Sequence, residues 1–87
     1  MLLKNASAGT MESSDVYVEI EPRESGIELE LDSVVIQQFG DEIRKVAHEV
    51  LAQQGVENAK LRLVDRGALD CVIRARVETA ILRGKGE

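Results

Sequence analysis

The chain has 87 residues, of which 44% are hydrophobic and 31% charged, the composition of one folded domain and not of a disordered chain. Its 16 acidic and 11 basic residues give a formal net charge of -5, and its aromatic content is only 2%. Both values argue against nucleic-acid binding, which uses basic patches and stacking rings. No segment has the length of a transmembrane helix or the apolar stretch of a signal peptide. The single cysteine excludes an internal disulfide, and we expect a cytoplasmic protein.

The start of the chain is rich in small and polar residues and has no hydrophobic periodicity. We therefore expect an exposed, flexible lead-in over residues 1–14. We expect a single α+β domain over 15–83 and a short C-terminal tail over 84–87.

Two segments near the N-terminus alternate between apolar and polar residues, the period of a half-buried strand. They are residues 16–21 and residues 27–32. The stretch between them contains Pro22 and Gly26, which suit a connecting loop. The pattern predicts two strands that form an antiparallel hairpin.

Beyond this hairpin the apolar residues recur at steps of three and four, which predicts an amphipathic helix over roughly 33–54. Asp32 or Ser33 is the expected N-cap, and Gly55 is placed to end the helix in left-handed geometry.

A third alternating segment predicts a strand over 59–64 that closes at Asp65-Arg66-Gly67. The last segment is ambiguous. As a helix it would place Arg76 in the middle of its apolar face, so a strand over 70–79 is the preferred interpretation because it leaves no charge on the buried side.

The predicted fold class is therefore α+β, with a small, mostly antiparallel sheet packed on one long helix in the order β-β-α-β-β; the alternative is β-β-α-β-α. Charge is divided between the two halves, because residues 1–32 carry two basic and eight acidic side chains, whereas residues 60–87 carry seven basic and four acidic ones. We expect cross-strand ion pairs on the outer sheet face; the alternative is a charged docking patch. The residues concerned are Glu19, Glu21, Glu28, Glu30, Asp32, Lys60, Arg62, Arg74 and Arg76.

Few residues are placed for catalysis. His48, the only histidine, falls on the predicted helix and is interpreted as solvated. Cys71 falls on the inward face of the last predicted strand, where a free cysteine packs as a small hydrophobe. No Cys/His cluster has metal-ligand spacing, and no glycine-rich phosphate loop is present. We expect a chain without catalytic residues and without a metal site.

Three segments carry a resemblance to a known family. They are Gly9-Thr10-Met11-Glu12-Ser13-Ser14-Asp15-Val16, Gln38-Phe39-Gly40, and Gly67-Ala68-Leu69-Asp70-Cys71-Val72-Ile73-Arg74-Ala75-Arg76. Together they resemble the acyl carrier protein (gamma) subunit of citrate lyase over nearly the whole chain. Met11 stands where the family usually has Leu, and the chain stops sooner after Arg76 than is usual for the family.

The resemblance implies that a serine of the first segment carries a phosphoribosyl-dephospho-coenzyme A group through a phosphodiester. Because the family allows Ser or Gly at the second position, the modified residue is expected to be Ser13, with Ser14 as the runner-up. Glu12 and Asp15 are candidates for recognition by the prosthetic-group transferase, or are simply solvated acids. The other implied partners are the alpha subunit, which exchanges acyl groups, the beta subunit, which cleaves citryl thioester, and an acetylating ligase.

Two other interpretations remain open. The chain could be a protein-protein adaptor that docks through its acidic hairpin without any prosthetic group, or the related acyl carrier of malonate decarboxylase. Asp32-Ser33 also resembles the attachment motif of fatty-acid carrier proteins, but those carriers are all-helical, so Ser33 is interpreted as a helix cap.

Overall fold

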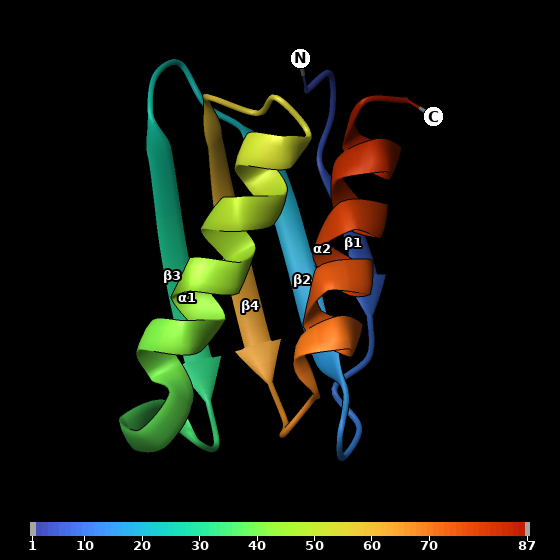
Figure 1. Cartoon of the computed structure of the whole chain (residues 1–87). Helices are drawn as coiled ribbons and strands as arrows, with labels where there is room; N and C mark the ends of the chain where they lie inside the picture. Colours follow the sequence, from blue (N-terminus) through green and yellow to red (C-terminus); the bar gives the residue numbers. More distant parts are fainter. Residues whose placement is uncertain (1, 87) are drawn as a thin grey trace.

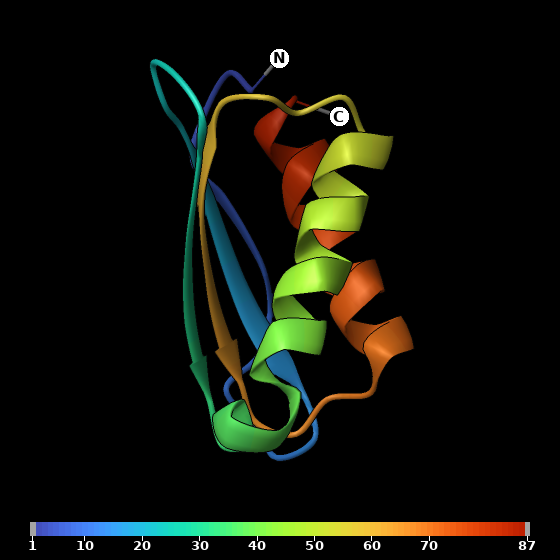
Figure 2. The same ribbon diagram turned by 60° about the vertical axis from the view of Figure 1, so that its left-hand side comes forward.

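Two helices cover one face of a four-stranded sheet in the computed structural model, which describes residues 2–86 (Figure 1). The side view separates the sheet layer from the helix layer (Figure 2). The elements in chain order are β1 (Ala6–Gly9), β2 (Val16–Pro22), β3 (Ile27–Ser33), α1 (Ile36–Gln53), β4 (Ala59–Asp65) and α2 (Asp70–Gly84).

The predicted α+β class is confirmed, and three of the strands lie where the alternation places them. The long helix starts later than predicted, at Ile36, and its N-cap position is Val35, which has no side-chain cap. Ser33 instead ends β3, and its hydroxyl oxygen accepts a hydrogen bond from the backbone N–H of Val35 at 3.1 Å. The predicted end of the helix is confirmed, because Gly55 has a φ of 70° directly after it.

The lead-in predicted over 1–14 contains a strand that the sequence pattern did not indicate. β1 pairs antiparallel with β2, in a register that places Ala6 opposite Ile20. Ala8 is buried in the core. Four small residues show no hydrophobic alternation, so this strand is specified by its pairing partner and not by its own periodicity. Only residues 10–15 form a connecting loop, and its flexibility stays a prediction.

The predicted hairpin between the second and third strands is wrong, because the sheet order is β1-β2-β4-β3 and β4 lies between them. β4 is antiparallel to β2 and parallel to β3, so the sheet is mixed. Charge gives a reason for this order: neighbouring β2 and β3 would set glutamates against glutamates across the outer face. Inserting basic β4 brings Arg62 Nη1 to 2.6 Å from Glu19 and Lys60 Nζ to 3.5 Å from Glu30.

The last segment is the helix α2 and not the preferred strand, so the alternative ending in a helix is the correct one. The objection to a helix was the charge of Arg76 on its apolar face. That charge is accommodated because the guanidinium reaches Asp15, and the neighbouring Arg74 pairs with Glu49 of α1 at 2.6 Å. Long basic side chains can bury their stems and keep their charged ends paired or hydrated.

The core lies between the sheet and the two helices. Both helices turn an apolar face inward, and every second residue of the two central strands points toward them. The buried residues include Val18, Ile20, Leu61 and Leu63 from the sheet, Val46, Val50 and Leu51 from α1, and Ile73, Val77 and Ile81 from α2.

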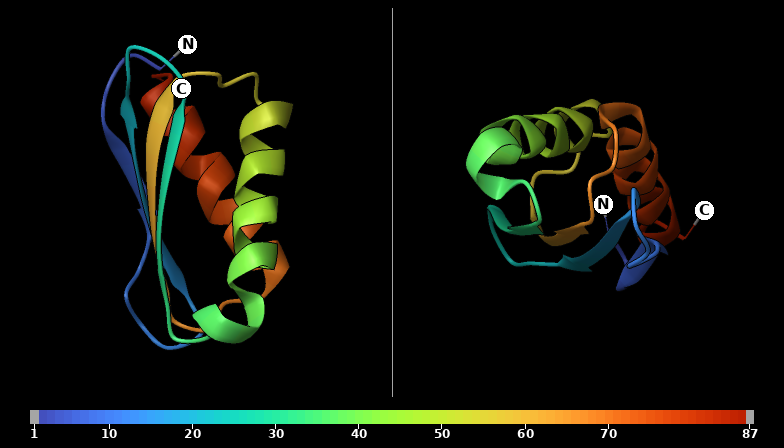
Figure 3. Two further views of the ribbon diagram at one scale, coloured as in Figure 1. Left: turned by 90° about the vertical axis from the view of Figure 1, so that its left-hand side faces the viewer. Right: turned by 90° about the horizontal axis from the view of Figure 1, so that it is seen from below.

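Three connections meet at one end of the molecule: β1–β2, β3–α1 and β4–α2 (Figures 1 and 3). Backbone hydrogen bonds join them, because Val34 N–H donates to Asp65 O at 3.2 Å and Ser14 N–H donates to Arg66 O at 2.8 Å. The fold therefore gathers segments that are far apart in the sequence at this end.

Candidate functional site

The loop Thr10–Asp15, called the serine loop below, connects β1 to β2. It turns at its tip, where the backbone N–H of Asp15 donates to the Glu12 carbonyl at 3.2 Å. Ser13 and Ser14 are the two central residues of this turn, and Ser14 has a φ of 65°. A positive φ at the second central position is the mark of a type II turn and favours glycine. Ser13 is exposed at the tip, and within residues 2–86 its hydroxyl makes no hydrogen bond.

Asp15 holds the base of the serine loop. Its carboxylate accepts hydrogen bonds from the Thr10 hydroxyl at 2.8 Å and from the Val16 N–H at 2.7 Å. Arg76 adds two more, from Nε at 3.2 Å and from Nη2 at 3.1 Å. The hydrogen bond from Thr10, followed by those from Arg76 and Val16, lowers the pKa of Asp15 to about 2. The side chain is only 15% exposed, so this carboxylate positions the loop.

A second carboxylate fixes the connections beside the serine loop. Asp65, at the end of β4, is 1% exposed. It accepts a hydrogen bond from the Ser33 hydroxyl at 2.8 Å and one from the Ala68 N–H at 2.9 Å. The next residue, Arg66, donates its backbone N–H to Asp15 O at 2.9 Å. The serine loop is therefore hydrogen-bonded to the β4–α2 connection, whose backbone Asp65 holds in turn.

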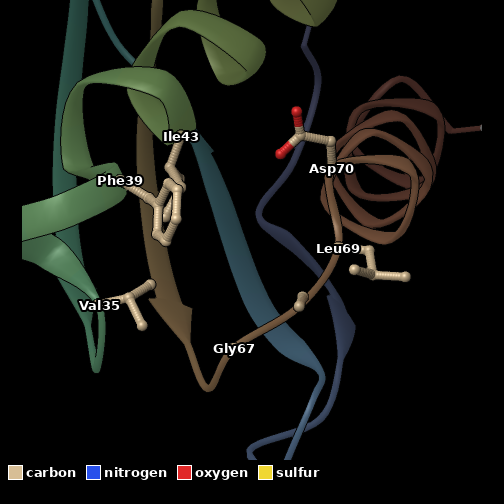
Figure 4. Close-up of a pocket in the computed structure, with 7 residues that line it drawn as sticks. Val35, Phe39, Ile43, Gly67, Leu69 and Asp70 are labelled. Atoms are coloured by element: carbon tan, nitrogen blue, oxygen red, sulfur yellow. The ribbon is translucent and has the colours of Figure 1, made fainter.

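An apolar pocket of about 470 Å³ opens at the same end, between the first turns of α1 and the β4–α2 connection (Figure 4). Phe39 in its wall is 50% exposed. The lining residues are Val35, Phe39, Ile43, Gly67, Ala68, Leu69 and Asp70. Three more large apolar residues are exposed at this end of the molecule. Met11 lies in the β1–β2 connection, Val34 in the β3–α1 connection, and Ile36 at the start of α1.

The structure places the predicted site residues in three different situations. Ser13, Ser14 and Glu12 are exposed on the serine loop, whereas Asp15 is turned into its base. A role of Glu12 or Asp15 in recognising a transferase stays a prediction. Ser33 is buried, and its hydroxyl donates to Asp65, so it is not available for attachment of a group.

The prediction for Cys71 is wrong. Because the last segment is a helix, Cys71 lies in the first turn of α2 and is exposed, not packed in the core. His48 is exposed on α1, as predicted. Within residues 2–86 no group of three or more His, Cys, Asp or Glu side chains could hold a metal ion, and no helix there is long and apolar enough to cross a membrane.

Three contributors to this end of the molecule were not foreseen: Asp65, Arg76 and the wall formed by Phe39. Phe39 and Arg76 do lie in segments that carry the family resemblance. The position of Arg76 on an otherwise apolar helical face also indicates a buried or half-buried acidic partner. Asp65 carries no such signal, because an acid at a strand end is ordinary turn chemistry.

This chain is similar to known acyl carrier proteins. Residues 3–84 match the family described as malonate decarboxylase delta subunit (MdcD). The chain is 57% identical over 83 residues to the citrate lyase acyl carrier protein of Escherichia fergusonii, covering 94% of this chain and 86% of that protein. It is 52% identical over 86 residues to the citrate lyase acyl carrier protein of Rhodopseudomonas palustris, covering 99% and 89%.

A solved structure has the same fold. The chain aligns with a chain from a Pseudomonas malonate decarboxylase hetero-tetramer in complex with malonate, with a TM-score of 0.80 and 21% identity, covering 92% of this chain and 82% of that chain. At this identity the likeness concerns the fold alone. The sequence identities to the curated relatives are much higher and extend over almost the full chain, so this chain belongs to the citrate lyase acyl carrier protein family.

Proposed function

We propose that this chain is the acyl carrier subunit of citrate lyase and carries a phosphoribosyl-dephospho-coenzyme A group on Ser13. The observation that carries the proposal is the serine loop itself. It presents the Ser13 hydroxyl to solvent at the tip of a turn, while Asp15 and Arg76 hold its base. Because Ser13 is exposed, a bulky group attached to it is accommodated without displacing core residues.

The turn favours Ser13 over Ser14 as the attachment residue. The φ of 65° at Ser14 is the conformation that glycine adopts without strain, and the turn makes no use of the Ser14 side chain within residues 2–86. This agrees with the Ser or Gly at that position in the motif that carries the resemblance. The backbone N–H of Ser14 is also tied to Arg66 O at 2.8 Å. These features support Ser13 as the proposed attachment residue.

The serine loop does not activate its own hydroxyl. Asp15 is engaged at the base of the loop, and its pKa of about 2 makes it a poor general base near neutral pH. Glu12 precedes Ser13 and is exposed, and within residues 2–86 it makes no hydrogen bond to the Ser13 hydroxyl. The only histidine, His48, lies on α1 outside this end of the chain. A serine hydroxyl without an adjacent base is a weak nucleophile. The transferase must therefore supply the base, and this chain contributes an accessible acceptor.

The group would supply a terminal thiol that carries acetyl and citryl residues as thioesters. The chain's own residues hold the attachment point and keep it solvent-exposed. The proposed partners are the alpha and beta subunits, the transferase and the acetylating ligase, all acting in the cytoplasm. Tethering gives the thioester an effective concentration of order mM at each catalytic subunit, more than a free coenzyme at low concentration would reach.

The test is intact-mass and peptide mass spectrometry after co-expression with the prosthetic-group transferase and the enzyme that makes its precursor. We expect one adduct of the mass of phosphoribosyl-dephospho-coenzyme A on the peptide that contains Ser13. Ser13→Ala should abolish the adduct, and the matched control Ser14→Ala should keep it. An adduct that persists in Ser13→Ala and disappears in Ser14→Ala would contradict the assignment.

The match to the malonate decarboxylase delta family favours one second candidate, the acyl carrier of that enzyme. Loaded chain mixed with the catalytic subunits of each enzyme separates the two, because only the correct set should turn over its substrate. A chain that stays unmodified beside an active transferase, yet binds catalytic subunits stoichiometrically, would instead be the adaptor without a prosthetic group.

A further inference from the structure

The three segments that carry the family resemblance meet at one end of the fold. Thr10–Asp15 form the serine loop, Phe39 lies in one wall of the apolar pocket, and residues 67–70 form the opposite wall. Figure 4 shows Val35, Phe39 and Ile43 facing this wall from the α1 side. Attachment of a group to Ser13 explains the first segment only. The other two segments call for a role of their own.

The pocket lies within reach of a group on Ser13. Ser14 N and Arg66 O are 2.8 Å apart. Standard backbone geometry places the Ser13 Cα about 2.4 Å from the Ser14 nitrogen and the Gly67 Cα about 2.8 Å from the Arg66 oxygen. The Ser13 Cα is therefore at most about 8 Å from the Cα of Gly67, which lines the pocket.

The lining selects for a flat, largely apolar ligand. Phe39 offers a half-exposed ring, and Val35, Ile43 and Ala68 add aliphatic surface. Gly67 and Ala68 have little or no side chain, so a planar group can approach the backbone of that wall. The volume of about 470 Å³ is that of a small-molecule site. Asp70 is the one ionisable residue of the lining and is placed to accept a hydrogen bond from an amino group.

We propose that this pocket binds the adenine base of the group carried on Ser13, with the ring of Phe39 as its stacking surface. The inference rests on the proposed function. In phosphoribosyl-dephospho-coenzyme A the phosphoribosyl unit joins the serine to the adenosine, so the base is near the attachment point and the thiol is at the far end. A pocket whose Gly67 wall lies within about 8 Å of the attachment residue therefore suits the base. The thiol would have to fold back to enter it.

Arg66 supports the same assignment. Its side chain is exposed and makes no ion pair within residues 2–86, while its backbone is bonded to both Ser14 and Asp15. The Arg66 backbone therefore lies beside the loop that carries the attachment residue. Its exposed side chain is long enough to form a charge-assisted hydrogen bond with a phosphodiester on Ser13. A docked adenine would leave only the pantetheine part free to move, directed away from the domain.

The first experiment is NMR on the loaded protein. We expect nuclear Overhauser contacts between the adenine H2 or H8 protons and the ring protons of Phe39, together with amide shifts at Gly67 and Ala68 relative to the unloaded protein. A loaded protein that shows no such contacts would overturn the inference and leave the proposed function intact. Contacts from the pantetheine methyl groups in place of adenine would also overturn it, as would amide shifts that appear only after a catalytic subunit is added.

Three variants sharpen the result. Phe39→Ala should remove the loading-dependent amide shifts at Gly67 and Ala68. Phe39→Leu should do the same, because it keeps apolar volume but loses the ring. The control is Leu3→Ala, because Leu3 is also exposed, at 69%, but lies near Gly84 at the other end of α2. All three proteins should still be loaded on Ser13 by intact mass. Loading-dependent shifts at Gly67 and Ala68 that survive in Phe39→Leu would show that stacking is not the interaction.

The inference remains testable if Ser13 is never loaded. Unloaded protein is then titrated with free 3′-dephospho-coenzyme A while the amide signals are followed. Saturable shifts at Gly67 and Ala68 support an adenine site if the binding affinity that they report falls about fivefold or more in Phe39→Ala. Absence of any shift up to mM concentration overturns it.

Discussion

Arg76 on α2 binds Asp15 at the base of the serine loop through two hydrogen bonds, 3.2 Å from Nε and 3.1 Å from Nη2. The two residues are 61 positions apart in the chain. The last helix therefore determines where the attachment loop is held, and the charge that seemed to exclude a helix is what fastens it. The ion pair is half-buried, with Arg76 41% and Asp15 15% exposed, so it is more sheltered from screening than a surface pair.

Asp15→Asn should destabilise the fold by about 1.5–3 kcal/mol near neutral pH, because charge-assisted hydrogen bonds are lost. The pKa of Asp15 falls from 3.8 to about 2 on folding. Its stabilising effect is therefore fully present above the unfolded value and is lost as the pH falls through the folded value. Urea unfolding across this range should show the difference between wild type and Asp15→Asn shrinking as the pH approaches about 2.

The control for this prediction is Asp41→Asn, because Asp41 is fully exposed and pairs with Arg44 only at 3.6 Å. It should change stability by less than about 0.5 kcal/mol at any pH. Parallel pH profiles for wild type and Asp15→Asn would show that the carboxylate is not the group that matters.

Ser14→Gly should stabilise the protein by about 0.5–1 kcal/mol. A non-glycine residue in left-handed geometry costs about 1–2 kcal/mol, and Ser14→Gly removes this strain. The substitution also loses about 0.4–1 kcal/mol of stability, because glycine raises the conformational entropy of the unfolded chain. Thermal unfolding of Ser14→Gly and Ser14→Ala makes the comparison, since Ala keeps the Cβ and should show no gain. A lower melting temperature for Ser14→Gly than for Ser14→Ala would mean that the turn does not have the φ of 65°.

Gly9→Ala should destabilise the fold by more than about 3 kcal/mol. Gly9 has a φ of 88°, and a Cβ there would overlap the carbonyl oxygen of Val16 on the other side of the serine loop. Gly26→Ala is the matched control, because its φ of 78° is similar but the nearest neighbouring atom is 3.6 Å away, at the end of Arg23. It should lose only about 1–2 kcal/mol. Equal losses in urea unfolding would show that strain alone matters at Gly9.

Cys71 should react fully with a thiol reagent in the folded protein, because it is exposed in the first turn of α2. Cys71→Ser should change stability by less than about 0.5 kcal/mol. A thiol count without denaturant should give one for the unloaded chain and two for the loaded chain. A Cys71 that reacts only in denaturant would restore the strand interpretation of the last segment, in which it packs in the core.

Local patterns in the sequence were sufficient to predict most of the strands and the first helix. Alternation identified β2, β3 and β4, and the spacing of three and four identified α1, because each of these elements buries one face and leaves the other wet. Gly55 marked the end of α1 because few other residues accept its φ of 70°. The motif Thr10–Asp15 pointed to the serine that we propose as the attachment residue.

The tertiary structure decided what depends on distant partners. β1 has no periodicity of its own and is paired with β2. β4 lies between β2 and β3, where its Arg62 and Lys60 pair with glutamates of both neighbouring strands. The same physical reason applies to α2 and the site. A charge on an apolar helical face is forbidden or favoured according to whether a partner such as Asp15 lies within reach, and no local pattern contains that information.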